Sequence, residues 1–475
     1  MQKILFVAAE GLPFIKSGGL ADVIGSLPKE LSKKGYDTRV VLPLYQKIID
    51  KHIDDLEKKY TFEVNIGATQ TIASVYECTL DGVVFYFIEH QHYFERDAMY
   101  GHWDDGERFA FFSKASLEML QHIDYFPDVI HSHDWHTGVV PILCKTQYPH
   151  DERYQSIKHV YTIHNLAYQG NFGPDMLTSC LNLSMNYFYD GTLRFHSGIS
   201  FMKAGIIYAN KVTTVSPTYA NEILDYSHGE GMDGVLHSRS WDLSGIVNGI
   251  DIDLWDPKTD KSLVKNYTSQ GLKSRLVNKE ALQKKLGLEV DQKPLLIGMV
   301  TRLTWQKGIH LVIERIHEIM NRPVQLVILG TGDSTIENDL KNIEQTYPGK
   351  AVYYCGYNED LAHQIYAGSD VFLMPSLFEP CGISQLISMR YGCLPIVRET
   401  GGLKDTVEPY NEFEKTGWGF SFTNFSEDDM IGTLDFVLKV YDRKDEWSEL
   451  IKKAMKQDVS WETSCMKYMD LYNGI

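Results

Sequence analysis

Short runs of apolar residues alternate along the chain with segments whose apolar residues recur at helical spacing. Residues 4–9 form the first apolar run, which is typical of a buried strand. The segment that follows has its apolar residues on one face of a helix: Leu20, Val23, Ile24, Leu27 and Leu31. Gly35 comes next, where a helix commonly ends. The pattern predicts a strand, a turn and an amphipathic helix at the start of the chain.

The same alternation continues through the first half of the chain. Further strands are predicted at residues 38–42, 83–88, 129–131, 160–163 and 212–215. Strands that alternate with helices form a parallel sheet covered by helices. A looser stretch rich in Asp, Asn, Lys and Thr follows at residues 248–270, and we interpret it as a linker.

The alternation then restarts. Strands are predicted at residues 295–300, 324–329, 352–354 and 371–374, with a helix from about Lys307. We therefore predict an α/β fold with two Rossmann-like, doubly wound domains. The expected boundaries are 1–246 for the first domain, 247–457 for the second and 458–475 for a final helical segment. Two such domains facing each other would form a deep cleft, and ligands of open α/β sheets bind beyond the carboxyl ends of the strands.

Composition narrows the class of protein. A chain of 475 residues with 43% hydrophobic and 23% charged residues is typical of a soluble two-domain enzyme. No apolar run approaches the ~20 residues that span a membrane, and the N-terminus lacks signal-peptide and transit-peptide features. Seven cysteines without a C-x-x-C pair indicate reduced thiols. We expect a cytoplasmic protein, and the net charge of −17 argues against nucleic acid as a partner.

The loop after the first predicted strand reads Lys-Ser-Gly-Gly-Leu and begins at Lys16. Backbone N–H groups at a helix start, together with the helix dipole, favour an anion. Gly18 and Gly19 would let a ligand approach the backbone, and Lys16 adds a positive charge. The loop predicts a phosphate-binding site. An ordinary strand-to-helix turn is the alternative.

Two further cations follow the strand predicted at residues 295–300. Arg302 and Lys307 flank its strand-to-helix turn. Together with Lys16 they would offer a diphosphate two kinds of partner, the fixed fork of arginine and the compact charge of lysine. A solvated surface pair is the alternative for this segment.

The segment after the strand predicted at residues 371–374 reads Pro-Ser-Leu-Phe-Glu-Pro-Cys-Gly-Ile-Ser-Gln. Pro380 restricts the backbone at Glu379, and Gly382 stands where the next helix opens with free N–H groups. A capped helix start with an inert cysteine is the alternative.

The loop at Lys16 and the segment around Glu379 together resemble the Lys-(Thr/Ser)-Gly-Gly-Leu and Glu-Pro-Cys-Gly-Leu-(Thr/Ser)-Gln motifs of the bacterial glycogen synthase and plant starch synthase family. The resemblance runs the whole length of the chain. It implies a retaining glycosyltransferase of the GT-B type that transfers glucose from ADP-glucose to glycogen or another α-1,4-glucan. It also implies that Glu379 and the amides of Cys381 and Gly382 hold the donor glucose, with phosphate near Ser384.

Residues 131–136 read His-Ser-His-Asp-Trp-His, which could indicate a zinc site, although the spacing fits no standard one. The resemblance instead implies that Asp134 is a functionally sensitive aspartate of the cleft. His164, which follows the strand predicted at residues 160–163, would lie beside the donor glucose. A satisfied buried histidine is the alternative for His164.

The resemblance also implies roles for two residues of the predicted second domain. Asn248 would lie near the donor sugar, and an Asn-Gly turn is the alternative. Tyr357 would stack on adenine, and ordinary packing is the alternative. The last helix, predicted at residues 461–472, would cross back onto the first domain.

Our mechanistic hypothesis is front-face attack, in which the departing diphosphate takes the acceptor proton. Arg302, Lys307 and Lys16 would stabilise its growing charge. On this account neither a cofactor nor a metal is required. Two alternatives remain, a glucan phosphorylase with lysine-bound pyridoxal phosphate and a catalytically silent glucan-binding protein. The sequence does not decide between ADP-glucose and UDP-glucose, and it leaves acceptor length and oligomeric state open.

Overall fold

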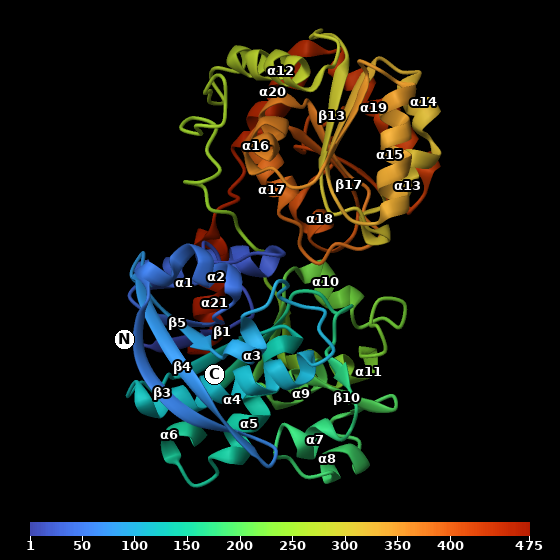
Figure 1. Cartoon of the computed structure of the whole chain (residues 1–475). Coiled ribbons are helices and arrows are strands. Elements are labelled where there is room, and N and C mark those ends of the chain that lie inside the picture. Colours follow the sequence, from blue (N-terminus) through green and yellow to red (C-terminus); the bar gives the residue numbers. More distant parts are fainter. The chain divides into compact units, whose positions relative to one another are not determined.

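The apolar run near the N-terminus forms the strand β1 (Lys3–Val7), all but its first residue buried, at the centre of a nine-stranded sheet. The computed structural model describes all residues from 1 to 475. They form two units, one made of Met1–Asn248 with Trp461–Ile475 and the other of Gly249–Ser460 (Figure 1). No helix combines the length and the apolar character needed to cross a membrane.

The sheet of the first unit has the strand order β12-β11-β7-β6-β1-β2-β5-β4-β3. All neighbours pair in parallel except β3 with β4 and β4 with β5. The bounds of the other strands are β2 (Asp37–Pro43), β3 (Glu57–Ile66), β4 (Thr69–Leu80), β5 (Val83–Glu89), β6 (Val129–His133), β7 (Lys158–Ile163), β11 (Lys211–Thr214) and β12 (Leu243–Gly245). A small antiparallel sheet contains β8 (Asn171–Phe172), β9 (Arg194–Phe195) and β10 (Gly198–Ser200).

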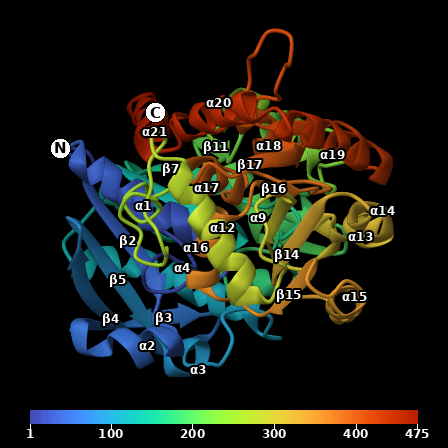
Figure 2. The same ribbon diagram turned by 90° about the horizontal axis from the view of Figure 1, so that it is seen from above.

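The antiparallel hairpin of β3 and β4 lies at one edge of the first sheet (Figure 2). The sequence analysis did not predict it. Most of its residues are polar, and the first five residues of β3 are exposed. The first half of β3 carries no apolar alternation, but Phe62, Val64 and Ile66 alternate with polar residues and are buried, a signal from which this strand could have been predicted.

Helices cover this sheet. They are α1 (Gly19–Lys33), α2 (Gln46–His52), α3 (Gln91–Phe94), α4 (Asp105–His122), α5 (Val140–Gln147), α6 (Glu152–Gln155), α7 (Met176–Ser179), α8 (Asn186–Tyr189), α9 (Phe201–Tyr208), α10 (Pro217–Glu222), α11 (Asp233–Ser238) and α21 (Trp461–Asn473). The predicted apolar face of α1 is buried throughout. The C-terminal helix α21 packs against α1, and its Tyr468 and Tyr472 belong to the core of the first unit.

The second unit contains a fully parallel sheet with the order β15-β14-β13-β16-β17-β18. Its strands are β13 (Leu295–Val300), β14 (Val324–Gly330), β15 (Ala351–Cys355), β16 (Val371–Met374), β17 (Leu394–Arg398) and β18 (Phe420–Phe422). The sequence analysis predicted the first four of these and missed the last two. The predicted α/β class with two parallel-sheet domains is confirmed.

Helices lie on both faces of the second sheet, with α16, α17 and α20 on one side and α13, α14, α15 and α19 on the other (Figure 1). The helices are α12 (Lys273–Leu286), α13 (Ile309–Glu314), α14 (Ile316–Met320), α15 (Ser334–Thr346), α16 (Glu359–Gly368), α17 (Ser384–Arg390), α18 (Gly401–Thr406), α19 (Glu427–Tyr441) and α20 (Lys444–Met455). The helix predicted from about Lys307 begins instead at Ile309, after a short 3-10 turn, Trp305–Lys307.

The segment interpreted as a linker, residues 248–270, contains neither helix nor strand, and from Gly249 onward it belongs to the second unit. Asp260 accepts hydrogen bonds from His363 (2.7 Å) and Tyr391 (2.5 Å). The Tyr267 hydroxyl donates to the Tyr391 carbonyl at 2.7 Å. These buried polar contacts hold the segment to α16 and to the turn after α17.

Candidate active site

Each sheet has one point at which the strand order reverses. In the first sheet the chain runs from β1 outward to β2 and β5, and it later returns to the other side of β1 with β6. In the second sheet the same reversal falls between β13 and β16. Loops at the carboxyl ends of strands diverge at such points and leave a crevice that commonly binds ligands. The loops that follow β1, β6, β13 and β16 contain most of the predicted site residues.

The loop after β1 is folded around a carboxylate that the sequence analysis missed. Buried Glu10 accepts hydrogen bonds from the backbone N–H of Ser17, from the Ser17 hydroxyl at 3.0 Å and from the backbone N–H of Gly18 at 3.3 Å. Burial is the largest influence on this carboxyl, and it raises the pKa of Glu10. Lys16 pairs with Asp22 at 2.8 Å. Two amides of the predicted phosphate loop are thus held by Glu10, while Gly19 begins α1.

Asp134 follows β6, and its carboxyl group contacts the backbone of His164, another predicted site residue. Its Oδ1 accepts a hydrogen bond from the backbone N–H of His164 at 2.7 Å. Desolvation raises the pKa of Asp134 to about 7, against the opposing effect of hydrogen bonds from the backbone of His164 and Asn165. Asp134 also has a φ of 56°. A non-glycine residue in the left-handed region stores strain of the kind found at functional sites.

The histidines of β6 are bonded inside the first unit. His131 contacts the Tyr472 hydroxyl through Nδ1 at 2.7 Å and the Thr162 hydroxyl through Nε2 at 2.6 Å. His133 contacts His164 ring to ring, with 2.9 Å between Nδ1 and Nε2. Burial lowers the pKa of both His131 and His133 and brings that of His164 to about 3. These rings are therefore neutral hydrogen-bonding groups near neutral pH.

The zinc alternative finds no support in this geometry. Both nitrogens of His131 are engaged by protein hydroxyls. No group of three His, Cys, Asp or Glu residues is arranged to hold a metal ion. His131 and His133 share one face of β6, with ring centroids 4.1 Å apart, but His136 lies in the 3-10 turn that follows, so the three rings do not form a ligand set.

In the second unit, Lys307 and Glu379 form an ion pair of 2.6 Å. The Ser376 hydroxyl donates to the same carboxylate oxygen at 3.1 Å. Glu379 is buried, and a buried carboxylate is stable only when it is paired and hydrogen-bonded. The structure therefore joins two predicted site residues that lie 72 positions apart in the sequence.

Backbone contacts lock together the two loops that hold this pair. The Leu377 N–H donates to the Gln306 carbonyl at 2.8 Å, and the Gln306 side chain donates to the Phe378 carbonyl at 3.2 Å. Gly308 has a φ of 67°, and a Cβ on it would lie 1.9 Å from the Pro375 carbonyl oxygen. Only glycine allows this approach, so Gly308 determines how closely Lys307 meets the loop of Glu379.

A second glycine turn, Gly401–Gly402, packs against the backbone of the Glu379 loop. The N–H of Gly402 donates to the Glu379 carbonyl at 3.1 Å. A Cβ on Gly401 would lie 2.0 Å from the same carbonyl oxygen. The Gly401–Gly402 turn therefore packs closely against the backbone of Glu379.

The remaining donor-side residues lie around this loop. Cys381 is buried, Gly382 has a φ of 75°, and Ser384 begins α17, whose first turn has no side-chain cap. Arg302 follows β13, is exposed and forms no ion pair. Tyr357 follows β15 and is 72% exposed. A helix start without a side-chain cap, a free guanidinium and an exposed ring at the edge of one parallel sheet are suited to a nucleotide sugar.

Asn248 is the last residue of the first unit and is buried. Lys16 also belongs to the first unit, whereas Arg302 and Lys307 belong to the second. The structure therefore brings together Asp134 with His164 in one unit and Lys307 with Glu379 in the other.

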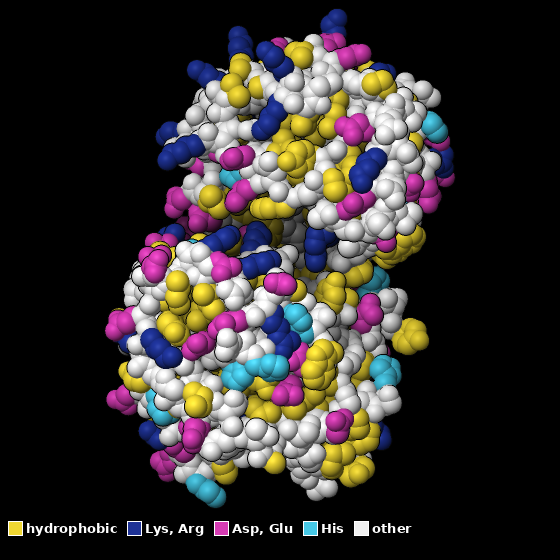
Figure 3. All heavy atoms as spheres, in the orientation of Figure 1, with side chains coloured by type: hydrophobic (Ala, Val, Ile, Leu, Met, Phe, Trp, Pro, Cys, Tyr) yellow, Lys and Arg dark blue, Asp and Glu magenta, His cyan; other side chains and the backbone are white.

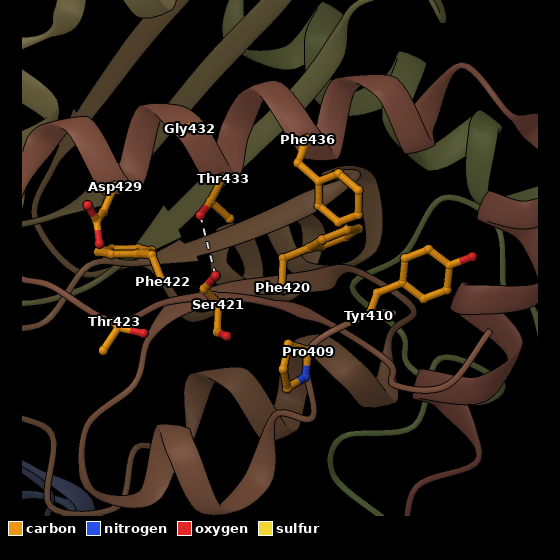
Figure 4. Close-up of a pocket in the computed structure, with 10 residues that line it drawn as sticks. All are labelled: Pro409, Tyr410, Phe420, Ser421, Phe422, Thr423, Asp429, Gly432, Thr433 and Phe436. Carbon is orange, nitrogen blue, oxygen red and sulfur yellow. Dashed lines mark hydrogen bonds between the residues drawn. The ribbon is translucent and has the colours of Figure 1, made fainter. Parts of the chain in front are cut away.

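A pocket of about 380 Å³ lies elsewhere, between β18 and α19 (Figure 4). It is lined by Pro409, Tyr410, Phe420, Ser421, Phe422, Thr423, Asp429, Gly432, Thr433 and Phe436. None of the predicted site residues contributes to it. Its location at the outer edge of the sheet, away from the reversal between β13 and β16, separates it from the candidate active site.

Over the face drawn in Figure 3, Lys and Arg side chains lie among Asp and Glu side chains.

The two α/β units, each with a sheet whose strand order reverses beside loops that contain predicted site residues, have the architecture of GT-B glycosyltransferases. Residues 3–238 match the family described as "Starch synthase catalytic domain", and residues 278–454 match "Glycosyl transferases group 1". The chain is 47% identical to a glycogen synthase of Clostridium perfringens over 473 residues, which covers 100% of this chain and 98% of that protein. It is 49% identical to a glycogen synthase of Geobacillus thermodenitrificans over 474 residues, again with 100% and 98% covered. The chain belongs to the bacterial glycogen synthase family.

Solved structures of other proteins have the same fold. The catalytic domain of starch synthase IV from Arabidopsis thaliana, bound to ADP and acarbose, superposes with a TM-score of 0.91 at 34% identity and covers 100% of this chain and 99% of its own. Sucrose-phosphate synthase from Thermosynechococcus elongatus has a TM-score of 0.64 at 15% identity, with 100% and 99% covered, and shares the fold.

Proposed function

We propose that this chain transfers a glucosyl group from ADP-glucose to the non-reducing end of an α-1,4-glucan, with retention of configuration and release of ADP. Full-length similarity to glycogen synthases supports the reaction. A related starch synthase solved with ADP and acarbose supports ADP as the leaving group. The observation that carries the site assignment is the Lys307–Glu379 ion pair, which joins the loops after β13 and β16, with the exposed Arg302 on the first of these loops.

The second unit supplies the donor contacts in this proposal. Glu379 accepts hydrogen bonds from the glucose hydroxyls, and the backbone N–H groups of Cys381 and Gly382 donate hydrogen bonds to hydroxyl oxygens. Lys307, which the Glu379 pair holds in place, and Arg302 neutralise the diphosphate. The amides at Ser384 meet phosphate, and the exposed ring of Tyr357 stacks on adenine.

The first unit supplies the remaining contacts. Lys16 and the backbone of Gly18 and Gly19 approach the phosphates. Asp134 and His164 contact the sugar or the acceptor, and Asn248 lies near the donor sugar. Glu10 already accepts from the amides of this phosphate loop, so a bound phosphate competes with Glu10 for the Ser17 and Gly18 N–H groups.

Retention follows from attack on the same face from which ADP departs. The bond between glucose C1 and the phosphate oxygen breaks, and the acceptor O4 forms the new bond to C1. The acceptor proton passes to the departing phosphate oxygen. A carboxylate nucleophile is not part of this proposal, since Glu379 is engaged by Lys307 and Ser376, and Asp134 by a backbone amide. The cationic side chains stabilise the leaving group, so the proposal requires neither a metal nor an organic cofactor.

The test measures nucleoside diphosphate release from ADP-glucose and from UDP-glucose, each with and without glycogen. We expect glycogen-dependent release of ADP. Lys307→Ala should lower kcat about a hundredfold, the usual cost of removing one preorganised charge partner. Lys261→Ala is the matched control, because Lys261 is exposed and forms no ion pair in the same unit.

Thermal unfolding of both variants separates loss of fold from loss of chemistry. Unchanged turnover in a folded Lys307→Ala protein would contradict the site assignment. Preference for UDP-glucose would contradict the assigned nucleobase, and phosphate-dependent release of glucose 1-phosphate from glycogen would instead indicate a phosphorylase.

A further inference from the structure

His133 and His164 share a hydrogen bond between two imidazole rings, 2.9 Å from Nδ1 of His133 to Nε2 of His164. Burial lowers the pKa of both rings, that of His164 to about 3, so both are neutral near neutral pH. A neutral imidazole carries one proton, on one of its two nitrogens. One ring must therefore donate this hydrogen bond and the other must accept it.

The surroundings of His133 decide which ring donates. Its other nitrogen, Nε2, is buried and has no hydrogen-bond partner. A proton there would be a buried donor without an acceptor, and buried N–H groups without a partner are rare in proteins because they are costly. The single proton of His133 accordingly lies on Nδ1. His133 is then the donor, and Nε2 of His164 is the acceptor.

The proton of His164 must in turn lie on Nδ1. No hydrogen bond within the protein involves this nitrogen, and His164 is only half-buried. The hydrogen bond from its backbone N–H to Asp134 holds the residue at the carboxyl end of β7. His164 therefore has one ring nitrogen turned inward as an acceptor and one available to a ligand as a donor.

We propose that His133 is a positioning residue that fixes the tautomer of His164, so that His164 presents an Nδ1–H donor to an oxygen of the sugar donor. The proposal rests on the proposed function, which locates His164 beside the donor. In this tautomer the accessible nitrogen cannot accept a proton. His164 thus binds and orients the donor, and it does not act as a general base through Nδ1.

Packing holds His133 in the orientation that this role needs. The ring centroids of His131 and His133 lie 4.1 Å apart, and Phe6 stacks on His133 at 5.9 Å. His131 is itself fixed at both nitrogens, by Tyr472 and by Thr162. Phe6 and His131 are also in contact, with centroids 5.3 Å apart, so the three rings form one cluster. A ring held in such a cluster has little rotational freedom, which favours one tautomer and one hydrogen bond.

Two substitutions separate the hydrogen bond from the packing. His133→Asn retains an amide N–H close to the location of Nδ1, whereas His133→Phe retains the aromatic contacts and removes the donor. We expect kcat/KM for ADP-glucose to fall at least about tenfold in His133→Phe and to recover to within about threefold of wild type in His133→Asn. His159→Phe is the control, because His159 is a buried histidine at the opposite end of β7.

A second readout is independent of activity. Spectra of ¹⁵N-histidine-labelled protein distinguish Nδ1–H from Nε2–H, and the His164 signals are assigned by their loss in His164→Gln. We expect the Nδ1–H tautomer of His164 in wild type and in His133→Asn, and a shift toward Nε2–H in His133→Phe.

Each outcome has a distinct meaning. An Nε2–H tautomer of His164 in wild type would overturn the proposal whatever the activity. Wild-type activity in His133→Phe, or equal losses in His133→Phe and His133→Asn that follow their thermal stability, would overturn the positioning role. The expected tautomer in a wild-type protein that transfers no glucosyl group would overturn the proposed function and the ligand of His164, while the tautomer assignment would stand.

Discussion

At the scale of single residues, the two most informative side chains are acids that the fold holds in unusual states. Glu10 accepts from the very amides expected to bind phosphate, and Asp134 accepts from the backbone of His164. Burial raises the pKa of both carboxyls. Burying a carboxyl group whose charged form is disfavoured costs free energy, so the surrounding contacts must compensate for it. Such groups are typical of functional sites.

Asp134 makes stability depend on pH. The folded-state pKa of Asp134, about 7, lies above the ordinary aspartate value of 3.8. Between these two pH values the folded state binds more protons than the unfolded state, so stability falls as pH rises through this range. Asp134→Asn removes the cost of the buried charge. We expect the variant to be more stable than wild type by about 1–2 kcal/mol near pH 8, a figure reduced by the partial exposure of the side chain, with little difference near pH 4.

Urea denaturation at the two pH values measures this difference. Asp54→Asn is the control, because Asp54 is exposed and forms no ion pair. A pH-independent difference between Asp134→Asn and wild type would contradict the raised pKa. Glucosyl transfer should fall in Asp134→Asn even where the protein is more stable.

Gly308 tests how closely the Lys307 turn must approach the Glu379 loop. Gly308→Ala adds a Cβ 1.9 Å from a carbonyl oxygen and forces alanine to a φ of 67°. Gly287→Ala imposes a similar φ of 75° with nothing within 4 Å. We expect Gly287→Ala to cost about 1 kcal/mol of unfolding free energy and Gly308→Ala about 1–3 kcal/mol more, because only the latter overpacks.

The two alanine variants also differ in what they do to the site. Gly308→Ala should lower transfer activity because it displaces Lys307, and Gly287→Ala should not. Equal stability losses in denaturant titrations would show that strain, and not the close approach, determines the need for glycine.

At the scale of elements, the C-terminal helix α21 is part of the first unit although 212 residues of the second unit, 249–460, precede it in the chain. Its Tyr472 reaches His131 across 341 sequence positions. This hydrogen bond ends a row of side chains that continues through the His131, His133 and His164 rings. The helix therefore contributes to the packing behind the candidate active site.

Tyr472→Phe isolates this contribution. The substitution keeps the ring and leaves Nδ1 of buried His131 without a partner, so we expect a loss of about 1–2 kcal/mol in the unfolding free energy of the first unit. Tyr161→Phe is the matched control, because the buried Tyr161 hydroxyl has no partner and its removal should be nearly neutral. Urea unfolding of both variants measures the two changes in unfolding free energy. Equal losses in the two variants would contradict an energetic role for the Tyr472 hydroxyl.

At the scale of the whole molecule, each unit has its own hydrophobic core. In the second unit, the main core is built from the parallel sheet and its flanking helices. Trp255 and Tyr267, from the segment before α12, also belong to this core. A core of this kind allows a domain to fold by itself. The donor-side residues Arg302, Lys307 and Glu379 all belong to this unit.

Residues 249–460 expressed alone should therefore fold cooperatively and bind ADP without catalysing transfer. Calorimetric titration with ADP measures the binding, and the same fragment with Lys307→Ala is the control, for which we expect at least about tenfold weaker binding. A folded fragment that binds ADP no better than its Lys307→Ala variant would contradict the donor-side assignment.

Much of this architecture could be predicted from the sequence. The strands β1, β13 and β16 are covered on both faces, so each is a continuous apolar run and local periodicity reveals it. The edge strand β3 is exposed along its first half and its neighbour β4 is exposed at both ends, and the same reasoning missed them. The loops with candidate chemistry were found because the turns between strands and helices follow from the alternation itself.

The sequence by itself determined the α/β class, the two parallel sheets and which loops contain reactive side chains, since burial and chain direction leave their periodicity in neighbouring residues. Only the tertiary structure decided which of those side chains meet. The Lys307–Glu379 pair, the Glu10 contacts and the contact of Tyr472 with His131 depend on strand order and on the return of α21. Strand order is set by long-range packing, and no local pattern records it.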